Sequence, residues 1–378
     1  MTPTYLLGLL LVQIPRSMAA PAFAEIGPLV ERGIHQGIYP GAVVVIGRRD
    51  TVLYSKGFGH LSWARGAGKP STRDTRWDLA SLTKVVATTS SVMVLVDQGR
   101  VNLDAPVAQY LPRFTGAGRE LITVRMLLDH TSGLRPYLPL YRLADNRAAA
   151  LDLLFNAVPD RIPGTSPEYS DLNAMLLGLV VEAVTGESLD AFAERDVFTP
   201  LRLGSTVFTP ALSPGVSVAP SWSARGRPVA GRVNDDNANL LGGVAGHAGL
   251  FSTGDDVARF AQVWLREGST PDGPWVSAGA VREFLHRTAR SGTRALGWDT
   301  PEMRGTVPSI YGRLAGPDTF GHSGWTGTML WIDPARDLFL VFLTNRSLEP
   351  RRRHSIMALH TLRTALSDLV IQGDQRRR

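Results

Sequence analysis

The stretch that decides the fold of this chain is residues 78–84, which read Asp78-Leu79-Ala80-Ser81-Leu82-Thr83-Lys84. The run that follows, Val85 to Val96, is largely apolar and contains neither Gly nor Pro, which predicts a buried helix. Residues three apart lie on one face of a helix, so the Ser81 hydroxyl is expected beside the Lys84 amine. A Lys on a buried helix is costly unless it has a task, such as helping to take a proton from a neighbouring hydroxyl. Ser and Lys three apart also recur by chance, so a helix start with a solvated Lys is the alternative.

A second segment with polar, chemistry-bearing residues is Pro163 to Asn173, which reads PGTSPEYSDLN. Its Pro and Gly predict a loop, and the apolar run Ala174 to Val184, which stops at Gly186, predicts a helix. Tyr169 is therefore expected at a loop-to-helix junction. A phenol near a Lys ammonium can have its pKa lowered and then carry protons. The alternative is a half-buried loop aromatic.

The third segment is Gly321-His322-Ser323-Gly324-Trp325-Thr326-Gly327-Thr328, which leads into a predicted strand, Met329 to Asp333. Taken alone, His322 is an ordinary loop or strand-edge histidine. Because the three segments occur together and in this order, a shared functional site is favoured over the separate structural alternatives for Lys84, Tyr169 and His322.

With these motifs the chain resembles the serine β-lactamase and penicillin-binding protein superfamily, in the branch of class C β-lactamases, D-alanyl-D-alanine peptidases and related esterases. Further segments with the same resemblance span roughly residues 40 to 346. They are Gly57-Phe58-Gly59, Leu103 to Val107, Tyr110-Leu111-Pro112, Leu127 to Leu134, Leu176-Leu177-Gly178, Gly246 to Ser252 and Leu343 to Arg346.

The resemblance implies a role for each matched residue. Ser81 corresponds to the acylated nucleophile, Lys84 to its proton-relay partner, and Tyr169 to the tyrosine that shares proton transfer with the Lys. The oxyanion hole is implied to use the backbone N–H groups of Ser81 and Trp325. Two such preformed donors contribute several kcal/mol to stabilising a tetrahedral oxyanion.

Two positions depart from the pattern of this family. Asp171 stands where the Tyr-x-Asn element usually has Asn, which replaces a donor amide with a carboxylate that only accepts when ionised. An ionised Asp171 near Lys84 would also favour the protonated amine. The element His322-Ser323-Gly324 has His where the family's third motif usually has Lys, as some D-alanyl-D-alanine peptidases of this branch do.

Composition is that of an ordinary enzyme of 378 residues, with 44% hydrophobic and 20% charged residues. The chain has no Cys, which excludes disulfides and thiolate chemistry, and its eight His show no metal-binding spacing. We therefore expect no metal and no cofactor. The net charge is +6, much of it in the clusters Arg351 to Arg353 and Arg376 to Arg378, and nothing resembles a nucleic-acid-binding module.

The N-terminal 24 residues are predicted to be a signal peptide. Tyr5 to Ile14 is an apolar stretch too short to span a bilayer, and Ala22-Phe23-Ala24 fits a cleavage site, with Met18-Ala19-Ala20 as a second choice. The first residues lack Lys and Arg, which departs from the usual pattern, and a frayed terminal helix is the alternative. We expect a periplasmic or secreted protein with no transmembrane span after signal removal.

The rest of the chain is predicted to form one α+β domain, residues 25–372, with a basic tail at 373–378. Strands at 42–46 and 51–56 form one hairpin, strands at 329–332 and 338–343 form a second, and residues 352–371 form a terminal helix. The resemblance implies an antiparallel sheet flanked by helices and a mostly helical lobe, with the active site between them. Residues 209–235, rich in Pro, Ser and Gly, are expected to be a long loop near the cleft mouth.

Three functions remain open at this point. The first is hydrolysis of small esters or amides through an acyl-enzyme; the second is a D-alanyl-D-alanine carboxypeptidase or D-amino-acid peptidase acting on cell-wall peptides. The third is a penicillin-binding sensor that acylates without turnover. Because His322 is mostly neutral near pH 7, we expect weak β-lactam hydrolysis and better turnover of short-chain esters or uncharged amides. If His322 binds a carboxylate, activity on D-alanyl peptides should rise as the pH falls toward 6.

Overall fold

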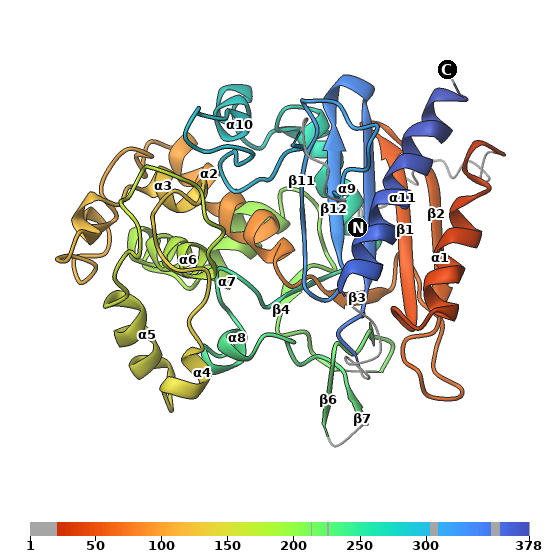
Figure 1. Cartoon of the computed structure of the whole chain (residues 1–378), viewed down its shortest axis with the longest axis horizontal. Coiled ribbons are helices and arrows are strands. Elements are labelled where there is room, and N and C mark those ends of the chain that lie inside the picture. Colours follow the sequence, from red (N-terminus) through yellow and green to blue (C-terminus); the bar gives the residue numbers. More distant parts are fainter. Residues whose placement is uncertain (1–20, 213, 225–226, 303–308, 349–355, 378) are drawn as a thin grey trace, which may run out of the picture.

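A five-stranded antiparallel sheet forms one side of the molecule in the computed structural model, which describes residues 21–212, 214–224, 227–302, 309–348 and 356–377 (Figure 1). The strands lie in the order β11-β12-β13-β1-β2, so the first and last parts of the chain share one sheet. Their bounds are β1 Gly41–Arg48, β2 Thr51–Gly59, β11 Phe320–Ser323, β12 Met329–Asp333 and β13 Leu338–Thr344. Each neighbouring pair is antiparallel.

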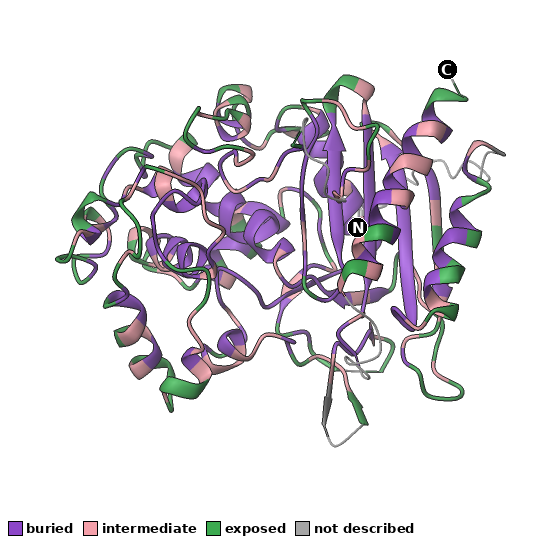
Figure 2. Cartoon of the chain, in the orientation of Figure 1, coloured by how far each residue is buried: buried purple, intermediate pink, exposed green. Residues whose placement is uncertain are grey.

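Both faces of this sheet are buried, which explains the almost continuous apolar sequence of its central strands (Figure 2). In β1, Val43 and Val45 point to the face covered by α9 (Gly254–Leu265). The alternate residues Ala42, Val44 and Ile46 belong to a second apolar cluster with helices α1 (Ile26–His35) and α11 (Ile356–Gln375). The period-two alternation of a strand thus separates one large core from a smaller outer one.

The second lobe is mostly helical and is built around the predicted buried helix. That helix runs from Leu82 to Asp97, with a wider π-helical segment, η2 (Lys84–Thr89), before α2 (Ser90–Asp97). Its residues are buried over most of the length, as Figure 2 shows for α2. The surrounding helices are α3 Val124–Leu128, α4 Leu140–Leu143, α5 Arg147–Phe155, α6 Asp171–Thr185, α7 Leu189–Ala193 with the π segment η5 Glu194–Phe198, α8 Asp236–Leu240 and α10 Ala278–Leu285.

Short elements join the two lobes and position the segment before Ser81. A four-stranded sheet has the order β4-β8-β3-β5, and its strand β3 ends directly before the nucleophile turn. The short strands are β3 Thr75–Asp78, β4 Val207–Phe208, β5 Ser217–Val218, β6 Trp222–Ala224, β7 Arg227–Val229, β8 Leu250–Ser252, β9 Ser269–Thr270 and β10 Gly273–Pro274. Single turns of 3-10 helix lie at Pro21–Phe23, Val107–Gln109, Arg119–Leu121 and Pro334–Arg336.

The predicted α+β class and both predicted hairpins are confirmed, and each hairpin strand is slightly longer than expected. The helix after Tyr169 is α6, and it stops where Gly186 adopts a left-handed φ of 75°, a conformation that Gly adopts at no steric cost. The segment 209–235 is largely loop, but it also contains the short strands β5, β6 and β7, which its weak periodicity did not reveal.

At both predicted ends of the domain, residues assigned to the flanking segments pack against the folded unit, and the boundaries themselves stay predictions. Phe23, expected to leave with the signal peptide, is 1% exposed and lies in the outer core against Tyr54. The expected tail at 373–378 begins as helix, because α11 continues to Gln375 and buries Asp374 in an ion pair with Arg48. Apolar and ionic contacts with α1 and the sheet thus extend the folded unit at both ends; residues 1–20 of the predicted signal peptide lie outside the described range.

Across the described ranges, no single helix has the length and apolar character to cross a membrane. One bent pair, Asp171–Thr185 with Leu189–Phe198, meets those criteria jointly, and it packs in the core of the helical lobe.

Candidate active site

The Ser81 side chain stands on a strained turn between β3 and the central helix. Ala80 has a φ of 48°, in the left-handed region that non-Gly residues rarely adopt. The Asp78 carboxylate stabilises this turn by accepting the Ala80 N–H at 2.9 Å, and it also accepts the Ser221 hydroxyl and the Asn234 N–H. Burial raises the pKa of Asp78 to about 6. Strained backbone of this kind persists where surrounding contacts over-determine it, and such positions cluster at functional sites.

Lys84 lies where the sequence predicts it, with its Nζ 3.1 Å from the Ser81 Oγ. The side chain is 4% exposed, and its Nζ also contacts the Asp171 Oδ1 at 2.7 Å and donates to the His247 carbonyl at 3.1 Å. Burial alone would lower the pKa of the Lys84 ammonium, but the Asp171 carboxylate and the Tyr169 phenol outweigh burial and raise that pKa above its ordinary value. Lys84 is therefore a cation at rest, as expected from Asp171 in place of Asn.

Tyr169 lies over this ion pair, with the Lys84 Nζ 5.0 Å from its ring centroid. A Lys ammonium can lower the pKa of a nearby phenol, but burial raises the pKa of Tyr169, and the attraction of Lys84 offsets burial only in part. The phenol is neutral at rest, so it can donate a proton or a hydrogen bond without first being protonated.

The third motif lies at the end of β11, the edge strand that faces the helical lobe. The turn after it is tied to the Ser81 turn because the Thr326 and Thr328 hydroxyls donate to the carbonyls of Asp78 and Leu79, each at 2.8 Å. Gly324 is required here, since a Cβ at this position would lie 2.5 Å from the Leu79 carbonyl oxygen.

The structure sets the charge of His322. Its ring is 5% exposed, and its Nδ1 lies 2.8 Å from the Ser323 carbonyl oxygen. Burial, together with the Lys84 and Arg294 cations, lowers the pKa of His322 to about 3. The imidazole is therefore neutral at pH 7, as expected, and it is also neutral at pH 6. A rise of activity on D-alanyl peptides toward pH 6, which we expect if His322 binds a substrate carboxylate, stays a prediction.

The two backbone groups predicted for the oxyanion hole, the N–H groups of Ser81 and Trp325, belong to residues that line one cavity. Within the described part of the chain, the structure gives neither N–H an intramolecular acceptor. The Trp325 side chain itself is half exposed at the cavity rim.

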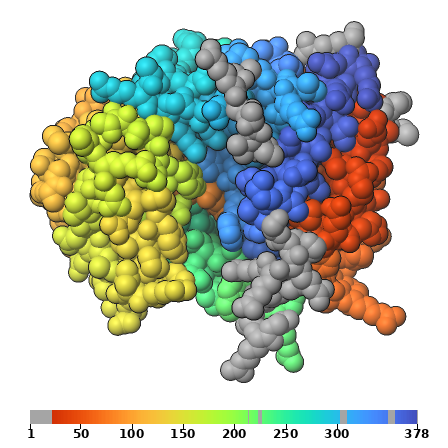
Figure 3. Space-filling view, viewed as in Figure 1, coloured from red at the N-terminus to blue at the C-terminus, as the bar shows by residue number. Residues whose placement is uncertain are grey.

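This cavity has a volume of about 940 Å³ and lies between the helical lobe and the sheet lobe. Figure 3 shows the hollow between the yellow-green and the blue parts of the surface. The cavity brings together all the predicted site residues except Lys84, which lies beneath Ser81: Ser81, Tyr169, Asp171, His322, Ser323, Gly324 and Trp325.

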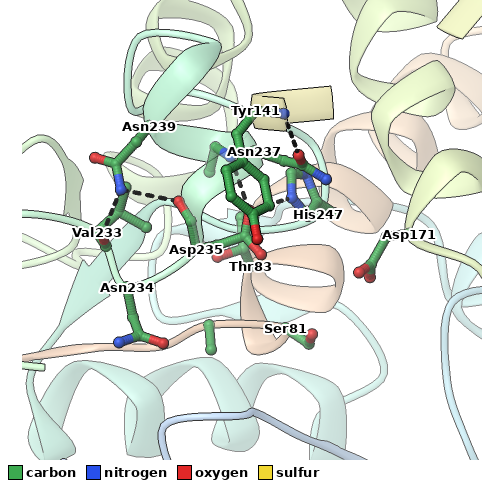
Figure 4. Close-up of polar contacts among 12 residues, drawn as sticks. Ser81, Thr83, Tyr141, Asp171, Val233, Asn234, Asp235, Asn237, Asn239 and His247 are labelled. Carbon is green, nitrogen blue, oxygen red and sulfur yellow. Dashed lines mark hydrogen bonds and ion pairs between the residues drawn. The ribbon is translucent and has the colours of Figure 1, made fainter. Parts of the chain in front are cut away.

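Three further groups that sequence reasoning did not assign also belong to the site. Figure 4 shows Asp235 and His247 above Ser81, with the His247 Nε2 2.9 Å from the Asp235 Oδ1. Burial alone would raise the pKa of the Asp235 carboxyl, but the attraction of His247 outweighs burial and lowers that pKa to about 2. This pair fixes the backbone carbonyl of His247 to which Lys84 donates. The segment 246–252 resembled the family, and that resemblance was the one signal for it in the sequence.

His130 is the second unassigned group, and it holds the segment that carries Tyr169 and Asp171. Its Nδ1 lies 3.2 Å from the Ser170 N–H and 3.0 Å from the Asn173 amide nitrogen. Because the Ser132 hydroxyl donates to the Asn173 oxygen, the amide NH₂ faces His130, and the His130 proton must be on Nε2. Burial lowers the pKa of His130, so the ring accepts both bonds as a neutral imidazole.

Arg294 is the third such group, and no pattern in the sequence pointed to it. It lines the cavity, and its guanidinium carbon lies 5.3 Å from the Tyr169 ring centroid. The Asp299 Oδ1 is 3.8 Å from the Arg294 Nη1, beyond hydrogen-bonding distance. The cleft thus holds a fixed cation beside Tyr169 and the neutral His322.

No group of His, Asp or Glu side chains in the described ranges has the geometry of a metal site. The assigned site residues offer a hydroxyl, an ammonium–carboxylate pair, a neutral phenol and two N–H donors.

The chain is similar to known proteins in both sequence and fold. The family model for beta-lactamase matches residues 27–362. The chain is 31% identical to a protein of Escherichia coli K12 named "Putative D-alanyl-D-alanine carboxypeptidase", over 85% of this chain and 82% of the relative. It is 33% identical to the N-acetylmuramyl-L-alanine amidase of Bacillus subtilis, over 86% of this chain and 81% of the relative.

Two solved structures share the fold. A class C beta-lactamase superposes with a TM-score of 0.73 at 18% identity, covering 95% of this chain and 98% of that structure. A family VIII carboxylesterase superposes with a TM-score of 0.71 at 21% identity, covering 95% of this chain and 99% of that structure.

Proposed function

The chain belongs to the serine β-lactamase and penicillin-binding protein superfamily, and we propose that it is an exported amidase of cell-wall peptides that works through an acyl-enzyme on Ser81. The amide it cleaves joins an acyl group to an α-amino acid whose carboxylate is received by Arg294. The observation that carries this proposal is the fixed Arg294 cation in the cleft, at the ring of Tyr169.

The proposed path of the proton follows from the resting charges. The Ser81 oxygen attacks the amide carbon as its proton passes to Lys84, while Lys84 hands one of its own protons to the Asp171 carboxylate 2.7 Å away. The N–H groups of Ser81 and Trp325 then stabilise the oxyanion. The neutral Tyr169 phenol protonates the leaving amine and is reprotonated through the Lys84–Asp171 pair. Water hydrolyses the ester by the reverse sequence of proton transfers.

Arg294 is suited to recognise a substrate carboxylate. A guanidinium binds carboxylates through two parallel hydrogen bonds, and Arg294 is only loosely engaged by Asp299. The cation that the third motif lacks at His322 is thus supplied from another loop.

The names of the curated relatives fit this reading. A D-alanyl-D-alanine carboxypeptidase and an N-acetylmuramyl-L-alanine amidase are both named for amide bonds with an amino acid on the leaving side. Where that amino acid is the C-terminal residue, as in a D-alanyl-D-alanine peptide, it carries the free α-carboxylate that Arg294 would bind. The wall lies outside the cytoplasm, which agrees with the predicted signal peptide.

The proposal is tested by comparing four substrates on wild type, Ser81→Ala and Arg294→Met. The substrates are a D-alanyl-D-alanine peptide, the C-terminal amide of that peptide, N-acetylmuramyl-L-alanine and a short-chain nitrophenyl ester. We expect wild type to prefer a free carboxylate over the amide by at least about tenfold, the value of one charged contact. Arg294→Met should remove this preference through KM and leave ester hydrolysis unchanged.

Hydrolysis of small esters is the second candidate, because a neutral His322 places no cation in the third motif. It would replace the first if the ester is the better substrate and Arg294→Met has no effect on any substrate. A fluorophosphonate label on Ser323 instead of Ser81, identified by peptide mass spectrometry, would contradict both candidate functions.

A further inference from the structure

Arg363 is a buried cation beneath the turn that follows β11. It lies in α11, is 1% exposed, and contributes to the wall of the active-site cavity. Within the part of the chain that the structure describes, no carboxylate lies within ion-pairing distance of its guanidinium, and its Nε–H has no partner. Burial and the nearby Arg346 lower the pKa of Arg363 to about 9, which still leaves it charged at neutral pH. An uncompensated buried cation is costly, so its contacts call for an explanation.

Those contacts are with two backbone carbonyls of one turn. The Arg363 Nη2 donates to the Gly324 oxygen at 3.1 Å and to the Thr328 oxygen at 2.8 Å. The turn is also closed internally, since the Gly324 N–H donates to the Thr328 oxygen and the Gly327 N–H donates to the Gly324 oxygen. Arg363 therefore hydrogen-bonds to both ends of the turn.

The Gly324 carbonyl and the Trp325 N–H are the two ends of a single planar peptide group. A donor that fixes the orientation of the carbonyl also fixes the direction of the N–H at the other end. A charged donor on the carbonyl oxygen polarises the peptide as well, and this strengthens its N–H as a donor.

We propose that Arg363 is a positioning residue of the oxyanion hole: by holding the Gly324 carbonyl, it aims and polarises the Trp325 N–H toward the oxyanion formed at Ser81. This inference rests on acyl transfer at Ser81, but not on the wall-peptide substrate. The role accounts for a full guanidinium charge buried on α11, where an apolar residue would otherwise pack at less cost.

The test compares Arg363→Met, which keeps length and removes charge and donors, with Arg363→Lys, which keeps the charge and can reach one carbonyl. The matched control is Ser367→Ala, one turn later on α11. Ser367 ties this helix to the sheet, accepting the Trp331 indole N–H at 2.9 Å and donating to the Ile310 carbonyl, without touching the turn. For each variant one measures kcat, KM, the inhibition constant of phenylboronic acid and the melting temperature, on whichever substrate the wild type turns over. Phenylboronic acid forms a tetrahedral anion on a serine and so reports the oxyanion hole.

We expect Arg363→Met to lose about 10- to 100-fold in kcat, less than the loss of a whole oxyanion donor, with an unchanged KM. Its affinity for phenylboronic acid should fall by a similar factor, and Arg363→Lys should recover part of both. Ser367→Ala should lower the melting temperature while leaving kcat and boronate affinity nearly intact.

Two results would overturn the inference. A raised KM with normal kcat and normal boronate affinity would make Arg363 a substrate anchor. The second result is that Ser367→Ala and Arg363→Met lose the same kcat and the same melting temperature. Arg363 would then only help α11 to pack against the sheet. A preference for esters would contradict the proposed wall-peptide substrate and leave the outcome of this test for Arg363 unaffected.

Discussion

Replacing Asp171 with Asn tests the proton path that is particular to this chain. The substitution keeps the shape of the side chain and removes the charge that lies 2.7 Å from the Lys84 Nζ. At that distance and an effective dielectric constant of about 20, the attraction is about 6 kcal/mol, or roughly four pK units. This is enough to explain why the Lys84 pKa is raised although burial acts to lower it.

Without the carboxylate, the pKa of Lys84 should fall to its ordinary value or below. An amine with the ordinary Lys pKa of about 10.4 is neutral in roughly one molecule in 2,500 at pH 7. Because the amide introduced by Asp171→Asn cannot accept a proton, only these molecules could activate Ser81. We therefore expect kcat/KM at pH 7 to fall by about 10²- to 10³-fold, the usual size of a lost general base.

The pH profile separates proton transfer to Asp171 from the alternative, in which Asp171 only keeps Lys84 protonated. In Asp171→Asn the rate should rise about tenfold per pH unit between pH 7 and 9, as the amine deprotonates, while the wild-type rate changes much less. The assay is kcat/KM against pH, with the melting temperature and fluorophosphonate labelling of Ser81 as controls. A variant that equals or exceeds wild type at pH 7 would refute the reasoning, since Asp171 would then only hold Lys84 in its inactive, protonated form.

Three further predictions concern other parts of the chain. Tyr169→Phe should keep the melting temperature and lose about 10²- to 10⁴-fold in kcat, and unchanged turnover would mean that the ring only packs. His322→Asn should leave the shape of the profile between pH 5 and 8 unchanged, because a pKa of about 3 already keeps the ring neutral there. A wild-type limb near pH 6 that disappears in the variant would contradict this. Phe23→Ala should lower the free energy of unfolding by about 3 to 5 kcal/mol, the cost of emptying a buried Phe site, and the mature N-terminus should lie upstream of Phe23. Denaturant unfolding and intact mass would check both, and a mature chain beginning at Glu25 with full stability would contradict them.

The sequence by itself determined the features that are local along the chain. The three-residue spacing of Ser81 and Lys84 on a helix places their side chains together, and the structure confirms the contact at 3.1 Å. The two hairpins follow from strand-like runs separated by short turns, and α6 follows from an apolar run that ends at Gly186. The proximity of Asp171 to Lys84 came from the family resemblance, since their segments lie far apart in the chain.

Tertiary structure alone decided which charges meet in the cleft. Arg294 has no motif around it, and it reaches Tyr169 only because its loop packs beside β11. In the sequence, nothing distinguishes Arg363 from the other polar residues of the terminal helix. Packing of α11 on the sheet places its guanidinium beside the Gly324 carbonyl. The pKa values of Tyr169 and His322 likewise depend on burial and on cations from distant segments. Periodicity and turn chemistry are properties of neighbouring residues, whereas desolvation and charge–charge energies depend on distances in space that only the folded chain fixes.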